Sequence, residues 1–154
     1  MPALRRVDGV DVLAEDPDLP GSVLLVTAGA FAEIGVAAAL RLHKQGIPVT
    51  VVDPRWVLPV PDAVVGLARD HALVVTLSDS GRHGGFGSAV ADALRAAECD
   101  VPLRDLAIPQ TFLDHGSRAD VLAAVGLGEQ DVARRITEWA AALRPAVLAP
   151  EQAR

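Results

Sequence analysis

The residues best placed for chemistry stand in one glycine-rich segment that follows a run of β-branched residues. They offer a guanidinium, an imidazole, three glycines and a hydroxyl: Arg82, His83, Gly84, Gly85, Gly87 and Ser88. Backbone N–H groups of such a loop can hold an anion at the start of a helix, and a nearby guanidinium adds a fixed positive charge. The other interpretation is a tight turn that lets the helix pack closely on a sheet. We favour the turn, because a dinucleotide fold carries its glycine fingerprint in the first strand–helix turn, where this chain has only Gly29.

A second candidate is the pair Arg55 and Trp56, which follows another buried run. Arg and Trp are enriched at the energetic centres of protein interfaces, and loops on a rigid scaffold often carry binding. The alternative is that Trp56 covers the protein's own core while Arg55 pairs with a local acid, and the sequence leaves both open.

These two candidates are expected on one edge of the sheet, because loops that follow parallel strands emerge together. We expect the functional surface to run from Gly29 through residues 53–56 to residues 79–88. An anion is the expected guest only if both arginines and the glycine loop share one face. The negative charge of Asp79 works against such a guest.

No other residues form a catalytic or metal-binding pattern. The four histidines are too far apart in the sequence for a metal-ligand motif, and no serine stands in a nucleophile-elbow context. Cys99 is the only cysteine, and the flanking charges of Glu98 and Asp100 oppose thiolate formation. We therefore predict no catalytic, cofactor-binding or metal-ligating residue in this chain. A single cysteine allows no internal disulfide and fits a cytoplasmic location.

Composition indicates a packed globular domain. The chain has 154 residues, of which 51% are hydrophobic and only 3% aromatic, so its core must be aliphatic. The net charge of −6 repels phosphate backbones, which argues against nucleic-acid binding. No apolar run reaches the ~20 residues that a membrane helix needs, so no membrane partner is expected.

Strand and helix patterns alternate from Val23 onward. Buried strands are predicted at residues 23–27, 49–52, 73–77 and 103–108, and an edge strand at 10–13. Helices are predicted at 31–45, 61–71, 88–98, 117–125 and 129–143. The alternation indicates a parallel sheet covered by helices on both faces, with right-handed crossovers. We divide the chain into a lead-in (1–22), one α/β domain (23–143) and a flexible tail (144–154).

Three longer segments carry a family likeness. They read VVDPRWVLPV at residues 51–60, VVTLSDSGRHGGFGS at 74–88 and PLRDLAIPQTFLDHG at 102–116. Together with Gly126-Leu127 before an acidic helix start, they resemble the C-terminal domains of 1-deoxy-D-xylulose-5-phosphate synthases over residues 4–143. Several segments in the right order are far more specific than one glycine motif. One departure is Ser78-Asp79-Ser80, where the family commonly has two acidic residues and then Asn, or Glu-Asp-Asn, so that only Asp79 keeps its charge.

The resemblance implies a fold. The wider relatives are the C-terminal domains of transketolase and of the thiamine-dependent 2-oxoacid dehydrogenases. The implied architecture is a three-layer α/β sandwich with an about five-stranded, mostly parallel sheet and helices on both faces. The stretch near Val10 would supply one antiparallel edge strand.

The resemblance also implies a role. Enzymes of this family join pyruvate to glyceraldehyde 3-phosphate, losing carbon dioxide, in isoprenoid precursor biosynthesis. They use thiamine diphosphate and magnesium, held by a Gly-Asp-Gly…Asn site and a Glu in the two preceding domains. This chain has no Gly-Asp-Gly and no Asn. It would be an assembly domain that binds no cofactor and has no activity alone, and that packs on the catalytic thiamine-binding domains of the same enzyme in a homodimer.

Two other roles stay open at this point. One is a small-molecule-sensing regulatory α/β domain that uses the crevice at the strand ends, and the other, ranked last, is a stand-alone nucleotide-binding enzyme. The sequence also leaves open whether the chain is a fragment of a larger enzyme or a separate subunit.

Overall fold

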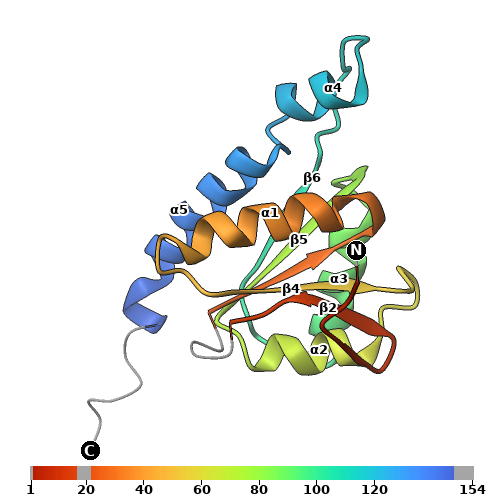
Figure 1. Ribbon diagram of the computed structural model, residues 1–154. Helices are drawn as coiled ribbons and strands as arrows, with labels where there is room; N and C mark the ends of the chain where they lie inside the picture. The colour runs from red at the N-terminus through yellow and green to blue at the C-terminus, as the bar shows by residue number, and fades with distance from the viewer. Residues whose placement is uncertain (1, 17–21, 148–154) are drawn as a thin grey trace, which may run out of the picture.

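The computed structural model describes residues 2–16 and 22–147, and Figure 1 shows a central sheet between two layers of helices. The strands are β1 (Arg5–Val7), β2 (Val10–Ala14), β3 (Val23–Thr27), β4 (Val49–Pro54), β5 (Leu73–Gly81) and β6 (Leu103–Ile108). The helices are η1 (Gly29–Phe31), α1 (Ala32–His43), α2 (Asp62–Arg69), α3 (Phe86–Ala96), α4 (Arg118–Ala124) and α5 (Glu129–Val147). None of the helices in these described ranges is both long and apolar enough to cross a membrane.

The sheet has the order β1-β2-β4-β3-β5-β6. The four strands β4, β3, β5 and β6 are parallel to one another, and β2 runs antiparallel to both of its neighbours. The direction in which successive strands are added reverses at β3. After β3 the chain passes through α1 to β4, which lies next to β3, and β5 then pairs with the opposite edge of β3. In open α/β sheets, such a reversal places a crevice outside the carboxyl ends of the two strands, which are β3 and β5 here.

Side-chain alternation along the strands builds one core on each face of the sheet. In β3, Val23 and Leu25 pack in the core beneath α1 and α5, whereas Leu24 and Val26 pack in the core beneath α2 and α3. All four side chains are buried, as expected for a parallel strand covered on both faces. The predicted three-layer architecture is confirmed (Figure 1).

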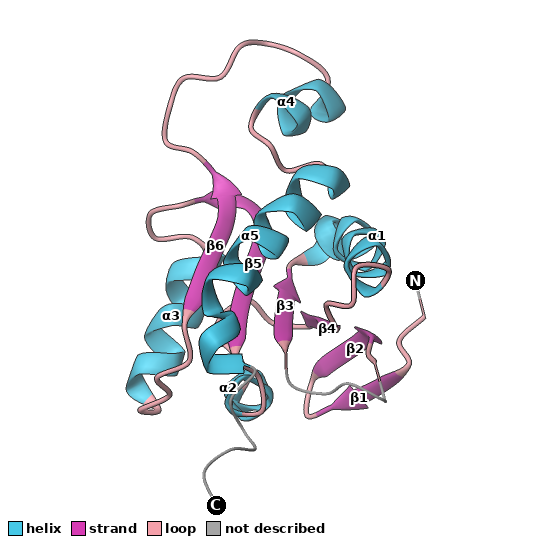
Figure 2. Cartoon of the chain, turned by 90° about the vertical axis from the view of Figure 1, so that its left-hand side faces the viewer, coloured by secondary structure: helices cyan, strands magenta, loops and turns pink. Residues whose placement is uncertain are grey.

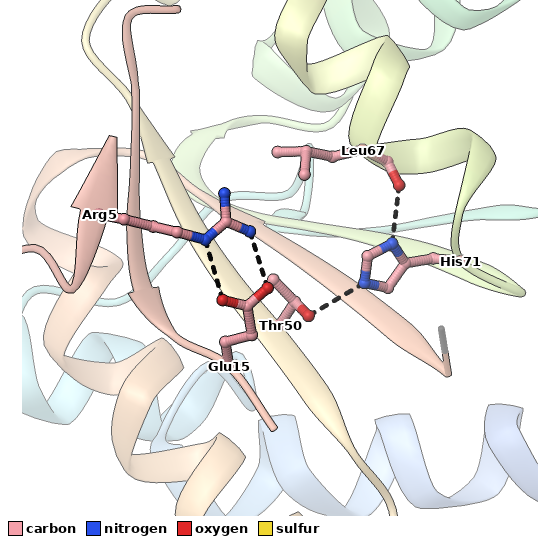
Figure 3. Close-up of polar contacts among 5 residues, drawn as sticks. All are labelled: Arg5, Glu15, Thr50, Leu67 and His71. Atoms are coloured by element: carbon pink, nitrogen blue, oxygen red, sulfur yellow. Dashed lines mark hydrogen bonds and ion pairs between the residues drawn. The ribbon is translucent and has the colours of Figure 1, made fainter. Parts of the chain in front are cut away.

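The sheet has six strands and not five, because β1 pairs with β2 in a hairpin. Two residues, Asp8 and Gly9, connect the strands with positive φ angles of 40° and 85°. That combination is the turn that a two-residue hairpin loop favours, and Asp-Gly is its typical sequence. The guanidinium of Arg5 also donates to the Glu15 carboxylate at 2.7 and 3.0 Å (Figure 3). The predicted single edge strand is therefore an antiparallel edge hairpin.

Most other boundaries differ from the prediction by one or two residues, and three differences affect the loop after β5 and the tail. β5 continues to Gly81 into the predicted loop, and α3 begins at Phe86 and not at Ser88. α5 continues through Val147, into the predicted tail. The rest of that tail, 148–154, and residues 1 and 17–21 of the predicted lead-in lie outside the described residues.

His71 joins a helix to the sheet. Its Nδ1 lies 2.7 Å from the Leu67 carbonyl oxygen, and its Nε2 lies 3.0 Å from the Thr50 hydroxyl in β4 (Figure 3). Since a carbonyl oxygen only accepts, Nδ1 carries a proton. The imidazole thus bridges the end of α2 to β4, which is a structural contact.

Helix α3 packs closely on the sheet where it meets β6. A Cβ atom added to Gly87 would collide with the carboxyl group of Asp105. That carboxyl group cannot turn away freely, because Oδ1 accepts a hydrogen bond of 2.7 Å from the Thr76 hydroxyl on β5. Gly87 is therefore required by the distance between α3 and the sheet.

We expect Gly87→Ala to destabilise the protein by about 1–3 kcal/mol, because the new methyl group overpacks the contact with Asp105. The measurement is the free energy of unfolding in urea. The control is Gly66→Ala at an exposed site in α2 where an added Cβ meets nothing within 4 Å. That change should stabilise by roughly 0.5–1 kcal/mol through helix propensity.

The cost should also shrink when Asp105→Ala accompanies Gly87→Ala, since the clashing group is then gone. Additive effects in that double-mutant cycle would contradict the proposed contact.

Candidate functional site

The candidate residues lie on loops that follow the parallel strands, at one edge of the sheet. We call this the carboxyl edge. Its loops are residues 55–61 after β4, 28–31 after β3, 82–85 after β5 and 109–117 after β6. The loops share this edge because the four strands run in the same direction.

Serine hydroxyls bind several backbone groups of the glycine loop. The Ser80 hydroxyl accepts from the Phe86 N–H at 3.0 Å, at the first residue of α3, and pairs with the Ser78 hydroxyl at 2.7 Å. The Gly84 N–H donates to the Ser88 hydroxyl, which in turn donates to the Arg82 carbonyl, both at 3.2 Å. Two N–H groups that could otherwise face an anion, those of Gly84 and Phe86, are thus bound by serine oxygens.

Close packing also explains a second glycine of this loop. A Cβ atom on Gly85 would collide with the Gly81 carbonyl oxygen. Arg82 N–H donates to the Ile108 carbonyl at 3.1 Å, which fastens the loop to β6. His83 is exposed, like Arg82 and Gly84 on either side of it. These contacts favour the tight-turn interpretation of the segment.

Acidic groups lie on both sides of the crevice. Burial raises the pKa of Asp105 above its usual value, while its bond from Thr76 and the charge of Arg82 act in the opposite direction. Burial likewise raises the pKa of Asp53, whose carboxylate accepts from the Gly29 N–H at 3.2 Å. Asp53 also lines an open pocket of about 400 Å³ with Asp11 and Glu33. A bound anion would meet these carboxyl groups.

Arg55 and Trp56 lie apart from the glycine loop. The Arg55 N–H donates to the Gly9 carbonyl at 3.0 Å, and its Nε lies 3.8 Å from the Asp11 carboxylate. Both contacts point to the β1–β2 hairpin, whereas Arg82 is fastened to β6 at the other side of the sheet. In the described part of the chain, no hydrogen bond or ion pair joins the two arginine loops.

Trp56 is not a core residue, since 70% of it is exposed. Leu58 is 68% exposed beside it. With Asp8, Gly9, Pro59 and Pro61, these side chains line an open depression of about 500 Å³. We call these six residues the Trp56 surface. The structure excludes the alternative in which Trp56 covers the core, and it identifies Asp11 as the acid nearest to Arg55.

Arg118 is a residue of this edge that sequence reasoning did not find. Its Nη1 donates to the Asp79 carboxylate at 3.0 Å, and its guanidinium carbon lies 5.5 Å from the centre of the Phe31 ring. Asp79 belongs to β5 and Phe31 to the turn after β3, so Arg118 spans the crevice between the two strand ends. No short-range signal could reveal this contact, because 39 residues separate Arg118 from Asp79.

The residues present do not fit the diphosphate–magnesium end of thiamine diphosphate. Within residues 2–16 and 22–147 there is no group of three or more His, Cys, Asp or Glu side chains that could hold a metal ion. The sequence has no Asn to complete such a site. The nearest carboxyl groups to the glycine loop would repel a diphosphate.

The sequence matches one family and its curated relatives closely. The family "Transketolase, C-terminal domain" matches residues 15–132. The 1-deoxy-D-xylulose-5-phosphate synthase of Saccharopolyspora erythraea is 60% identical over 150 residues, covering 96% of this chain. That of Mycolicibacterium gilvum is 62% identical over 144 residues, covering 93% of this chain. In each case the chain spans only 23% of the length of the relative.

Solved structures agree on the fold. A chain titled "Split gene transketolase, inactive beta4 tetramer" superposes with a TM-score of 0.74 and 27% identity, over 88% of this chain and 43% of that one. A transketolase mutant of Pichia stipitis gives 0.63 and 14%, over 87% of this chain and 18% of that one, which shows the fold alone. The sequence resemblance is confirmed: the chain belongs to the transketolase C-terminal domain family.

Proposed function

We propose that this chain is the assembly domain of a thiamine diphosphate-dependent transferase of the 1-deoxy-D-xylulose-5-phosphate synthase type. The supporting observation is the identity of about 60% to such synthases along almost the whole chain. The reaction would be the one that the sequence resemblance implies, in which pyruvate and glyceraldehyde 3-phosphate combine with loss of carbon dioxide. A cytoplasmic location is part of the same proposal.

The catalytic groups would come from outside this chain. The chain corresponds to 23% of the length of its relatives, and it lacks the Gly-Asp-Gly and Asn residues that thiamine enzymes use for the diphosphate and magnesium. Thiamine diphosphate would supply the electron sink for the reaction when bound in the preceding domains. The part of this chain would be to pack against those domains and hold them in place.

The Trp56 surface is the proposed contact with the catalytic domains. Trp56 and Leu58 expose apolar surface at a rigid edge, and such patches mark interaction sites. The surface also includes Asp8 and Gly9, which connect β1 to β2 near the amino-terminal end of the domain. In the relatives' type of enzyme, a C-terminal domain is preceded in the chain by the catalytic domains. The proposed partner would therefore join this domain at its amino-terminal end, close to Trp56.

Self-association is a further part of the proposal. The split-gene transketolase chain that resembles this one at 27% identity is described as an inactive tetramer of its β chain. Assembly of like chains and lack of activity are both named for that protein, and we propose both for this chain alone. The assembly expected for this chain is a homodimer.

A sensor role has less support. Ligands of open α/β sheets bind in the crevice where the strand order reverses. Here Arg118 spans that crevice through Asp79 and Phe31. A stand-alone nucleotide enzyme has less support still. The carboxyl groups of Asp53 and Asp105 would repel a phosphate, and serine hydroxyls already bind the Gly84 and Phe86 N–H groups of the glycine loop.

We expect the isolated chain neither to bind thiamine diphosphate nor to consume pyruvate, because it has no residues for the diphosphate and its metal. Isothermal titration of the pure chain with thiamine diphosphate and magnesium should give no binding heat at micromolar concentrations. The comparison is a complex of this chain with the part of the Saccharopolyspora erythraea synthase outside the matched 23%. Micromolar binding by the chain alone would refute the proposal.

We expect Trp56→Ala to weaken that complex by about 2 kcal/mol or more, roughly 30-fold in dissociation constant, as for a central interface residue. The change should alter the free energy of unfolding by no more than about 0.5 kcal/mol, since Trp56 is exposed. Leu40→Ala, at a 61% exposed leucine on α1, serves as the matched control and should change neither quantity. Loss of stability with the complex intact would contradict the assignment.

A further inference from the structure

A row of three charged side chains crosses the β1–β2 hairpin, which Figure 2 shows at the edge of the sheet. Arg6 of β1 is directly opposite Asp11 of β2, and Asp11 is directly opposite Asp53 of β4. Side chains at opposed positions of antiparallel strands lie close together on one face, and like charges there weaken the pairing. The hairpin therefore joins the rest of the sheet at a position where two carboxylates face each other.

The two carboxylates have different partners. Arg6 donates to Asp11 through Nε, and the Nε of Arg55 lies 3.8 Å from the same carboxylate. Asp53 instead accepts from one backbone N–H, that of Gly29, at 3.2 Å. Within residues 2–16 and 22–147, no ion pair involves Asp53. Guanidinium groups thus offset the charge of Asp11, whereas the charge of Asp53 has no such counter-ion.

The charged side chains that face Asp53 in its pocket are acidic. Asp11 and Glu33, from β2 and α1, line this open pocket of about 400 Å³ together with Asp53. Burial raises the pKa of Asp53, the Gly29 hydrogen bond lowers it, and the charge of Asp11 raises it further. The hydrogen bond from Arg6 lowers the pKa of Asp11. Asp11 therefore stays ionised at a pH at which Asp53 takes up a proton.

We propose that the attachment of the β1–β2 hairpin to β4 is sensitive to pH, with Asp53 as the group that titrates and Asp11 as the fixed charge opposite it. A proton on Asp53 removes the repulsion across the β2–β4 pair, and the hairpin is held more firmly. The turn of the hairpin supplies Asp8 and Gly9 to the Trp56 surface. The same proton therefore steadies one wall of that surface, whether or not a partner occupies it.

Linkage gives the direction of the effect on stability. The folded chain binds the Asp53 proton more tightly than the unfolded chain, in which an aspartate has a pKa of about 3.9. The free energy of unfolding therefore falls as the pH rises from that value through the higher pKa of folded Asp53. Asp11 acts in another interval, because its stabilisation is lost only as the pH falls below about 3.9.

The first test is urea unfolding of the chain from about pH 4 to about pH 8. Asp53→Asn removes the charge and keeps an oxygen for the Gly29 N–H. Near neutral pH it should lower the equilibrium constant of unfolding about twofold or more, the size of one cross-strand charge pair. The difference should disappear towards pH 4, where the unchanged chain is also neutral at this position. An Asp53→Asn chain that matches the unchanged chain at every pH would overturn the proposal.

A double-mutant cycle with Asp11→Asn identifies the source of the repulsion. In the Asp11→Asn chain, the stabilisation by Asp53→Asn at neutral pH should shrink, because the opposing charge is gone. If the two changes are additive, Asp53 titrates through burial alone and the repulsion across the hairpin is refuted.

Amide hydrogen exchange measures whether the hairpin itself responds. At neutral pH, Asp53→Asn should slow the exchange of the β1 and β2 amides by about twofold or more, as in the unfolding test. Asp105→Asn is the matched control: burial also raises the pKa of Asp105, but this residue lies in β6, at the opposite edge of the sheet. The control should stabilise the whole chain and leave hairpin exchange unchanged. Equal slowing of the hairpin amides by both variants would mean that the Asp53 proton is linked to global unfolding, and the assignment to the hairpin would fail.

Discussion

The reversal of strand order between β3 and β5 determines where this domain can bind anything. Their following segments depart to opposite faces of the sheet, η1 and α1 to one and α3 to the other. Arg118, from a segment distant in the sequence, contacts Asp79 at the end of β5 and lies over the Phe31 ring after β3. The same contact fixes α4 and the loop before it. This end of the sheet therefore holds a part of the chain itself, in the place where open α/β sheets commonly bind a ligand.

The glycine loop shows how an anion-site sequence can form a structural turn. Ser80 and Ser88 bind N–H groups that would otherwise face a ligand. Gly85 and Gly87 are needed because backbone and carboxyl oxygens lie where their Cβ atoms would be. Ser80 stands in the segment in which this chain departs from the usual family residues, and its hydroxyl meets the first N–H of α3. The Ser80 hydroxyl thus accepts the N–H at the start of α3, at the position where the sequence resemblance implies Asn.

The sequence predicted the fold well wherever one short stretch contains its own signal. Strand β3 was predicted with its observed ends, because burial on both faces leaves a continuous apolar stretch. The ends of β6 were also predicted, although Arg104 and Asp105 interrupt its apolar residues and only Leu106 and Ala107 are buried. β1 was missed because its residues are polar and exposed, although Asp8-Gly9 is a recognisable hairpin turn. The exposure of Trp56 could not be predicted, since a Trp after a strand suits a core and an interface equally. Arg118 lay beyond sequence reasoning for a different reason: its partners are distant in the chain and meet it only after the sheet has formed.

A domain that performs no chemistry can still be required for catalysis if it fixes the positions of others. The exposed surfaces of this domain support such a role by their placement. The Trp56 surface adjoins the hairpin at one edge of the sheet, and the exposed segment 110–120 follows β6 at the other (Figure 2). Between them lies a sheet whose central strands are buried on both faces, which is a stiff connection. Catalytic domains that contact the Trp56 surface, as proposed, would therefore be held against a stiff body. The aliphatic core and the bonds that fasten the loops to neighbouring strands serve that rigidity.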